Sequence, residues 1–297
     1  MPDYSPMMKQ YWIIKNQYKD AIVFFRLGDF YEMFYDDAKL VSSELDLTLT
    51  ARDCGQDEKA PMCGIPFHSC ESYIARLVAN GHKIAMCDQM EDPSKAKGLV
   101  RREVVRVITP GTVMESSMLD ESKNNYICSM FIEDSLAGIC FCDVSTGELK
   151  ATQLSGKDII GQIRNEIGRF SPREILVGGK VSLLEPIKLF IKDKLSCSME
   201  LMDVQNFDLT ACKERILKHF GEERFKVNEM DSKELNVRCI GALLSYLEET
   251  QKTGIERINK IEFYTEAEYM GLDINTIRNL ELLETMRNKQ KRGSLLW

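Results

Sequence analysis

The 297-residue sequence predicts an α/β protein with two domains and the start of a third, helical segment. Short apolar runs of strand length alternate with stretches whose apolar residues recur every three or four positions, which is the period of a helix. Residues 112–125 are rich in Ser, Glu, Asp and Asn and indicate a linker between two such regions. We therefore place a first domain at 1–113, a linker at 114–125, a second domain at 126–252 and a truncated helical segment at 253–297.

The first domain is predicted to be a small mixed-sheet α/β domain. Its expected helices lie at 5–19, from Asp29 to 45, and from about 69 to Gly81, which would follow the helix end. Its expected strands lie at 21–26, 47–52, 83–88 and 103–108, with a polar turn at 53–60 and a loop at 91–100. This order of helix and strand gives the α/β class.

Residues 26–37, with the sequence RLGDFYEMFYDD, are the most informative stretch. A helix beginning near Asp29, a suitable N-cap residue, would bury apolar residues at helical spacing. That buried face would consist of Tyr31, Phe34, Ala38, Val41 and Leu45. Phe30 and Glu32 would then share the exposed tip of a strand-to-helix turn, a position that often serves recognition. The plainer interpretation is a Phe folded under the loop beside a solvated Glu.

The second domain begins with three strand-like runs at 126–132, 136–144 and 148–154, joined by two short turns. A helix at 157–169 and a strand at 174–178 follow, and a helix at about 234–252 ends the domain. Three antiparallel strands followed by alternating helix and strand predict an RNase H-like layout.

An enzymatic role of the second domain is disfavoured by its residues. RNase H-like nucleases gather three or four carboxylates around two metal ions. Asp143 and Glu148 lie on the second and third strands, but the first strand has no carboxylate, so we expect Asp143 to support the turn at 145–147. A phosphate-binding G-x-x-x-x-G-K-[ST] loop is also missing. We therefore predict no catalytic residues, no metal and no cofactor in this chain.

Net charge, the basic residues and the cysteines further restrict the classes of function and the cellular setting. A net charge of −7 argues against a generic nucleic-acid binder. The basic cluster is equally well a DNA contact or a solvated loop, and consists of Lys95, Lys97, Arg101, Arg102 and Arg106. The ten cysteines form no C-x-x-C pair, no signal peptide or membrane span is apparent, and so we expect reduced, buried thiols in a cytoplasmic protein. His68 is expected to pack or cap rather than to catalyse.

Several blocks in order carry a resemblance to a known family. They are Gly28–Lys39 (GDFYEMFYDDAK), Pro61–His68 (PMCGIPFH) and Val104–Thr112 (VVRVITPGT). They closely resemble the mismatch-recognition domain of the MutS family of bacterial DNA mismatch repair proteins. The likeness continues through 246–253 and 278–282 to 293–297, which resembles the beginning of the family's lever region.

The resemblance implies roles for particular residues. Phe30 matches the family's minor-groove wedge and Glu32 the carboxylate that reaches a base edge. Arg52, Met62 and Arg102 align with positions near the DNA backbone or groove, although Met62 is equally well a core residue. The implied function is recognition of mismatched or unpaired bases in double-stranded DNA during mismatch repair.

The resemblance also implies partners. The second domain would be a connector that couples to a MutL-type repair protein, in a nucleoid-associated, cytoplasmic setting without a membrane. ATP and Mg belong to a family domain C-terminal to this point, and that domain makes the parent a homodimer, so we expect this chain to be a monomer. The alternative is a protein-interaction fragment with no significant DNA binding of its own.

Overall fold

The computed structural model describes residues 4–297 except 56–57, 93–97, 121–122, 180–184, 196, 228–229, 266–271, 273 and 289. The chain forms two compact units. The first unit comprises Met1–Asn124 and Tyr246–Ile255, and the second comprises Asn125–Ser245 and Glu256–Trp297. Residues 246–252, placed with the second domain from sequence, cluster with the first unit, although all but the last belong to one helix that starts in the second, at Glu234–Gln251. No helix among the described residues is long and apolar enough to cross a membrane.

The first unit is built on a six-stranded mixed sheet with the order β3-β4-β2-β1-β5-β6. Strand β1 pairs in parallel with β5, whereas the other pairs are antiparallel. The strands are β1 (Ala21–Leu27), β2 (Phe30–Phe34), β3 (Thr50–Arg52), β4 (Ala60–Pro66), β5 (Lys83–Gln89) and β6 (Arg102–Ile108).

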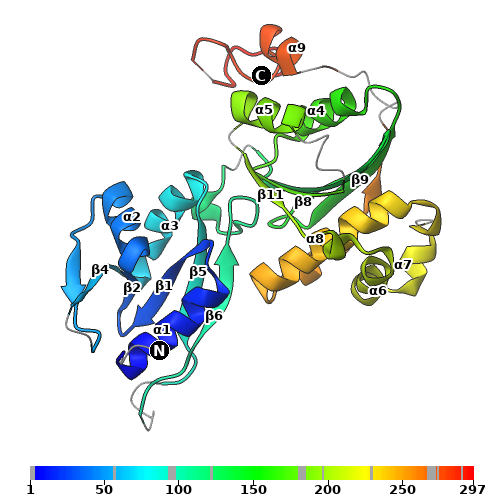
Figure 1. Ribbon diagram of the computed structural model, residues 1–297. Coiled ribbons are helices and arrows are strands. Elements are labelled where there is room, and N and C mark those ends of the chain that lie inside the picture. The colour runs from blue at the N-terminus through cyan, green and yellow to red at the C-terminus, as the bar shows by residue number, and fades with distance from the viewer. Residues whose placement is uncertain are drawn as a thin grey trace. The chain divides into compact units, whose positions relative to one another are not determined.

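Helices cover both faces of this sheet (Figure 1). Helices α2 (Tyr35–Leu45) and α3 (Cys70–Ala79) share one apolar core with the sheet, and α1 (Pro6–Gln17) shares another on the opposite face. Short 3-10 helices lie at Phe67–Ser69 and Ser116–Met118. The mixed-sheet α/β prediction for this part of the chain is confirmed.

The predicted helix from Asp29 is wrong in its first turn. The chain instead makes the antiparallel strand β2, and helix α2 begins only at Tyr35, where φ is +54°. The five residues expected to be buried are buried, because the strand and the helix point them into the two cores. Strand β4 was also not predicted, and the strand expected at 47–52 is limited to Thr50–Arg52.

The second unit contains a six-stranded sheet with the order β11-β10-β7-β8-β9-β12. Strands β7, β8 and β9 form the predicted antiparallel meander, and β10 and β11 run parallel to β7, which is the expected RNase H-like layout. The strands are β7 (Tyr126–Glu133), β8 (Leu136–Asp143), β9 (Glu148–Ser155), β10 (Glu174–Gly179), β11 (Ser198–Leu201) and β12 (Glu262–Phe263).

Helices α4 (Ile159–Phe170) and α5 (Glu185–Lys194) pack on one face of the second sheet, and α6 (Leu209–Phe220), α7 (Glu222–Val227) and part of α8 (Glu234–Gln251) lie on the other side (Figure 1). Close packing on the second face is visible at Gly138, where an added Cβ would lie 2.5 Å from the Leu235 carbonyl oxygen. The segment predicted to be helical after 253 contains a 3-10 helix at Ile255–Arg257 and α9 (Ile274–Asn279), but it also supplies strand β12 of the second sheet.

The cysteines are free thiols, and all but Cys197 are buried. Burial raises the pKa of the Cys63 thiol to about 11 and that of the Cys140 thiol to about 12. The prediction of buried, unpaired thiols is confirmed for these residues.

Candidate nucleic-acid interface

A two-residue hairpin turn brings Phe30 to the surface of the first unit. Leu27 pairs with Phe30 across the β1–β2 hairpin, so Gly28 and Asp29 are the loop. Gly28 has φ +58° while Asp29 has no positive φ, which is the pattern of a type II′ turn with glycine in the first central position. The exposed tip is thus a strand-to-strand turn, and the predicted strand-to-helix turn at this position is wrong.

Strand geometry explains the Phe-x-Glu spacing. Successive residues of β2 point to opposite faces of the sheet, so Phe30 and Glu32 share one face while Tyr31 and Met33 share the other. Tyr31 and Met33 are buried, whereas the Phe30 side chain is 46 % exposed. An apolar ring and a carboxylate are therefore presented side by side on one face of one strand.

Contacts behind the tip hold the turn in place. The Arg26 guanidinium lies 3.5 Å from the centre of the Phe67 ring, and its Nε donates to the Gly28 carbonyl at 2.5 Å. The Phe67 N–H donates to the Asp29 carbonyl at 2.9 Å. Both turn carbonyls thus have fixed donors, which restricts the motion of the residue that follows. Sequence reasoning missed Arg26 and Phe67 because their contact joins two different strand ends.

Glu32 is ion-paired across the sheet. Its Oε2 accepts from Arg52 Nη1 at 2.5 Å, with the Glu32 side chain 13 % exposed and the Arg52 side chain 40 % exposed. Arg52 ends strand β3, and strand β4 lies between it and β2. Gly64 of β4 stands opposite Glu32 and has no side chain to obstruct this part of the face. The structure therefore brings together two of the predicted DNA-contacting residues.

Arg102 is placed inside the fold. It is 7 % exposed, and its guanidinium donates to the Arg26 carbonyl at 2.7 Å, to Gln10 Oε1 at 3.0 Å and to the Val100 carbonyl at 2.9 Å. Burial lowers the pKa of Arg102, and the charge of Arg52 lowers it further while that of Glu32 raises it. Arg102 thus lies within electrostatic range of the Glu32–Arg52 pair, with its Nε and Nη1 donating to other groups of the protein.

Met62 lies between the two interpretations that the sequence left open. It is partly buried, packs at the margin of the core under α1, and pairs with Phe34 on β2 and Thr50 on β3. Its exposed part lies on the same face as Phe30 and Glu32, because Met62 pairs with Phe34 two positions after Glu32.

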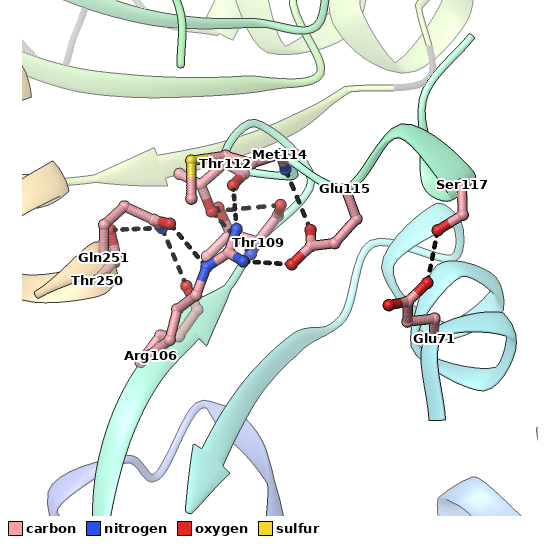
Figure 2. A network of polar contacts seen from close by, with 10 residues as sticks. Glu71, Arg106, Thr109, Thr112, Met114, Glu115, Ser117, Thr250 and Gln251 are labelled. Atoms are coloured by element: carbon pink, nitrogen blue, oxygen red, sulfur yellow. Dashed lines mark hydrogen bonds and ion pairs between the residues drawn. The ribbon is translucent and has the colours of Figure 1, made fainter. Parts of the chain in front are cut away.

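The basic cluster does not form a continuous DNA-facing patch among the described residues. Arg106 is engaged inside the first unit, as Figure 2 shows: its Nε donates to Gln251 Oε1 at 2.8 Å, its Nη2 to the Thr112 carbonyl at 2.9 Å, and its Nη1 to Glu115. Arg101 is paired with Glu103. Lys95 and Lys97 lie outside the described residues.

The two strand carboxylates considered for a nuclease site, Asp143 and Glu148, are hydrogen-bonded within the fold. Asp143 is 2 % exposed and accepts from the backbone N–H groups of Asn125, Ser145 and Thr146 and from the Ser145 hydroxyl, which confirms its predicted role in the turn. Glu148 accepts from the Tyr126 hydroxyl at 2.6 Å. No group of three or more His, Cys, Asp or Glu residues suited to a metal ion occurs in the part of the chain that the structure describes.

Comparison with known proteins matches this architecture unit by unit. The family model for MutS domain I matches residues 5–117, and the model for MutS domain II matches residues 125–262. The first matched region lies in the first unit, and the second lies in the second unit except for residues 246–255, which cluster with the first.

Curated relatives match over the whole chain. A protein of Acetivibrio thermocellus is 47 % identical over 297 residues, one of Caldanaerobacter subterraneus subsp. tengcongensis is 48 % identical over 293 residues, and one of Clostridium botulinum is 44 % identical over 294 residues. They cover 100 %, 98 % and 99 % of this chain, which corresponds to 34 %, 33 % and 31 % of their own lengths. The chain thus spans about a third of the length of these relatives.

An α/β chain with a mixed-sheet unit that exposes an aromatic hairpin tip, followed by an RNase H-like unit, has the N-terminal architecture of a multidomain repair protein family. The chain belongs to the MutS family, and its two units correspond to domains I and II. Each of the three relatives carries the name DNA mismatch repair protein MutS.

Proposed function

We propose that the first unit recognises mismatched or unpaired bases in duplex DNA, with Phe30 as a wedge in the minor groove and Glu32 as a reader of a base edge. The observation that carries this proposal is the position of Phe30: a large ring, 46 % exposed, directly after a tight turn and on the same face as Glu32. Membership of the MutS family and the names of the relatives supply the class of ligand.

The wedge tests how easily a base pair unstacks. Inserting an apolar side chain between base steps costs a few kcal/mol of stacking and kinks the duplex, and the cost is least where pairing is already broken. A mispair or an unpaired base also lowers the bending energy. Because Phe30 is already exposed, its insertion removes apolar surface from water without unfolding any part of the core.

Glu32 adds a polar contact that depends on the base. A carboxylate repels phosphates, so its placement beside the wedge favours a role at a base edge. There it accepts from a thymine N–H or, when protonated, donates to a purine ring nitrogen. The contacts of Arg26 and Phe67 hold the turn before Phe30, and strand β2 places Phe30 and Glu32 on one face, so that insertion of the ring brings Glu32 close to the groove.

The test compares Phe30→Ala with Phe30→Tyr and with Leu136→Ala, which removes an exposed apolar side chain of the second unit. Fluorescence anisotropy would measure binding of the 297-residue chain to a duplex with one G·T mismatch and to its fully paired counterpart. Low salt is needed because the chain carries a net charge of −7 and phosphate contacts weaken with salt.

We expect the wild type, Phe30→Tyr and Leu136→Ala to prefer the mismatched duplex, and Phe30→Ala to bind both duplexes equally. The thermal midpoint of Phe30→Ala should stay close to that of the wild type, because the ring is exposed. A retained mismatch preference in Phe30→Ala would refute the wedge. Negligible binding of the wild type to either duplex would favour the alternative, a protein-interaction module.

A further inference from the structure

We infer that Arg52 is a positioning residue that holds Glu32 away from the base until a mismatch is present, and so sets a threshold for mismatch reading. This inference deepens the proposed function and rests on it. Its basis is the ion pair between Arg52 Nη1 and Glu32 Oε2, which engages one oxygen of the carboxylate that would read the base.

The ion pair is built into the face that carries the wedge. Glu32 is nearly buried while Arg52 is far more exposed, so an approaching phosphate meets the guanidinium first. Within the described part of the chain, Arg52 is the one side chain hydrogen-bonded to the Glu32 carboxylate. Arg102 is near, but its Nε and Nη1 donate to backbone carbonyls and to Gln10, which fixes its guanidinium inside the fold.

Binding to a mismatch requires an exchange of partners. Arg52 moves from the Glu32 carboxylate to a DNA phosphate, which is an equally suitable anionic acceptor for a guanidinium. Glu32 is then released to a base edge. No bond is made or broken covalently, and the number of charge-assisted hydrogen bonds is conserved for Arg52.

On fully paired DNA no new interaction offsets the opening of the ion pair, because the wedge does not insert and Glu32 has no base partner. The pair then stays closed, and it also neutralises the carboxylate that would otherwise repel the phosphates. Opening the Arg52–Glu32 ion pair therefore costs free energy only when the mismatch is read. Arg52 lowers the ratio of mismatch affinity to paired affinity. It also prevents the Glu32 carboxylate from repelling the phosphates of fully paired DNA.

A double-mutant cycle separates this role from a simple phosphate contact. Arg52→Gln, Arg52→Lys, Glu32→Gln and the double variant Arg52→Gln/Glu32→Gln would be measured on the mismatched and the paired duplex under the conditions used for Phe30. Thermal melts of each variant would establish that the fold is retained, as expected for a pair at a partly exposed site.

We expect Arg52→Gln to weaken binding to both duplexes but to raise the mismatch-to-paired ratio by on the order of threefold, the size of a partly exposed ion pair. In the Glu32→Gln background the same substitution should leave the ratio unchanged, and Arg52→Lys should give an intermediate ratio. Equal losses on both duplexes in both backgrounds would overturn the inference while leaving the wedge intact. Absence of mismatch preference in the wild type and in Phe30→Tyr would refute the proposed function itself.

Discussion

Both units are α/β folds, but they differ in how accessible their polar and aromatic side chains are. In the first unit, one sheet face is left partly open, where an exposed ring, a carboxylate and a guanidinium lie together. In the second unit, the sheet is packed on both faces, and its strand carboxylates Asp143 and Glu148 are hydrogen-bonded within the fold. The comparison teaches that the type of residue does not identify a site. What distinguishes the first unit is that the Phe30 ring and the Arg52 guanidinium remain accessible beside Glu32.

The largest difference in the free energy of unfolding should appear when a buried and an exposed phenylalanine are each replaced by alanine. Phe141 of β8 is fully buried and its ring is stacked on that of Phe170 at 4.0 Å between centroids. Phe141→Ala should lower the free energy of unfolding of the second unit by about 3–5 kcal/mol because it leaves a cavity. Phe30→Ala should change the stability by less than about 0.5 kcal/mol. Urea denaturation of both variants measures this; equal losses would mean that Phe30 is a core residue.

A smaller effect is expected at Asp143. Asp143→Ala removes the acceptor of three backbone N–H groups, and the unsatisfied donors should cost about 1–3 kcal/mol. Asp143→Asn keeps one acceptor oxygen and should cost less. Neither the wild type nor these variants should cleave nucleic acid in Mg²⁺ or Mn²⁺. A nuclease activity of the wild type that is lost in Asp143→Asn would show that Asp143 is functional rather than structural, and would contradict the comparison of the two units.

The smallest effect concerns pH. Burial alone would raise the pKa of Glu148, but Lys150 and the Tyr126 hydroxyl lower it more, so its pKa in the folded chain lies below the ordinary 4.5. A lowered pKa contributes stability above the unfolded value, and this contribution is lost as the pH falls through the folded value. Glu148→Gln should therefore cost about 0.5 kcal/mol at pH 7.

The stability difference between Glu148→Gln and the wild type should disappear as the pH falls below 4.5. Denaturation curves at a series of pH values measure it. Glu32→Gln provides the comparison, since we expect its effect in DNA selectivity rather than in stability. A pH-independent difference for Glu148→Gln would show that packing rather than charge connects it to Tyr126.

Most of the fold was predictable because strand and helix periods were clear. The meander of the second unit and helix α8 lie within a residue or two of their predicted ranges. The error at 29–34 has a physical cause. Tyr31, Phe34 and Ala38 fit a helical spacing, but Tyr31 and Met33 also fit a strand, and the tight turn at Gly28 decided for the strand. Local spacing cannot separate the two when a strand runs directly into a helix.

The candidate site was predictable only as a set of residues. The resemblance indicated Phe30 and Glu32, and the structure adds that both lie on one face. The resemblance could not indicate that the side chains of Arg102 and Arg106 turn inward. The acceptors of their guanidinium groups come from distant parts of the chain, such as Gln10 and Gln251. Nor could the resemblance indicate that Arg52 is already occupied by Glu32, since the two stand on strands separated by a third.

The hairpin has a consequence for how this surface can evolve. Because the side chains of β2 alternate, one residue inserted between Phe30 and Glu32 would send the two groups to opposite faces, and one deleted would do the same. Substitutions elsewhere on the strand can be absorbed by repacking, whereas a change in the number of residues cannot. The spacing of the Phe-x-Glu motif is therefore more strictly constrained than the identity of most residues around it. A relative that keeps both residues but changes the number of residues between them would no longer place the two side chains on one face.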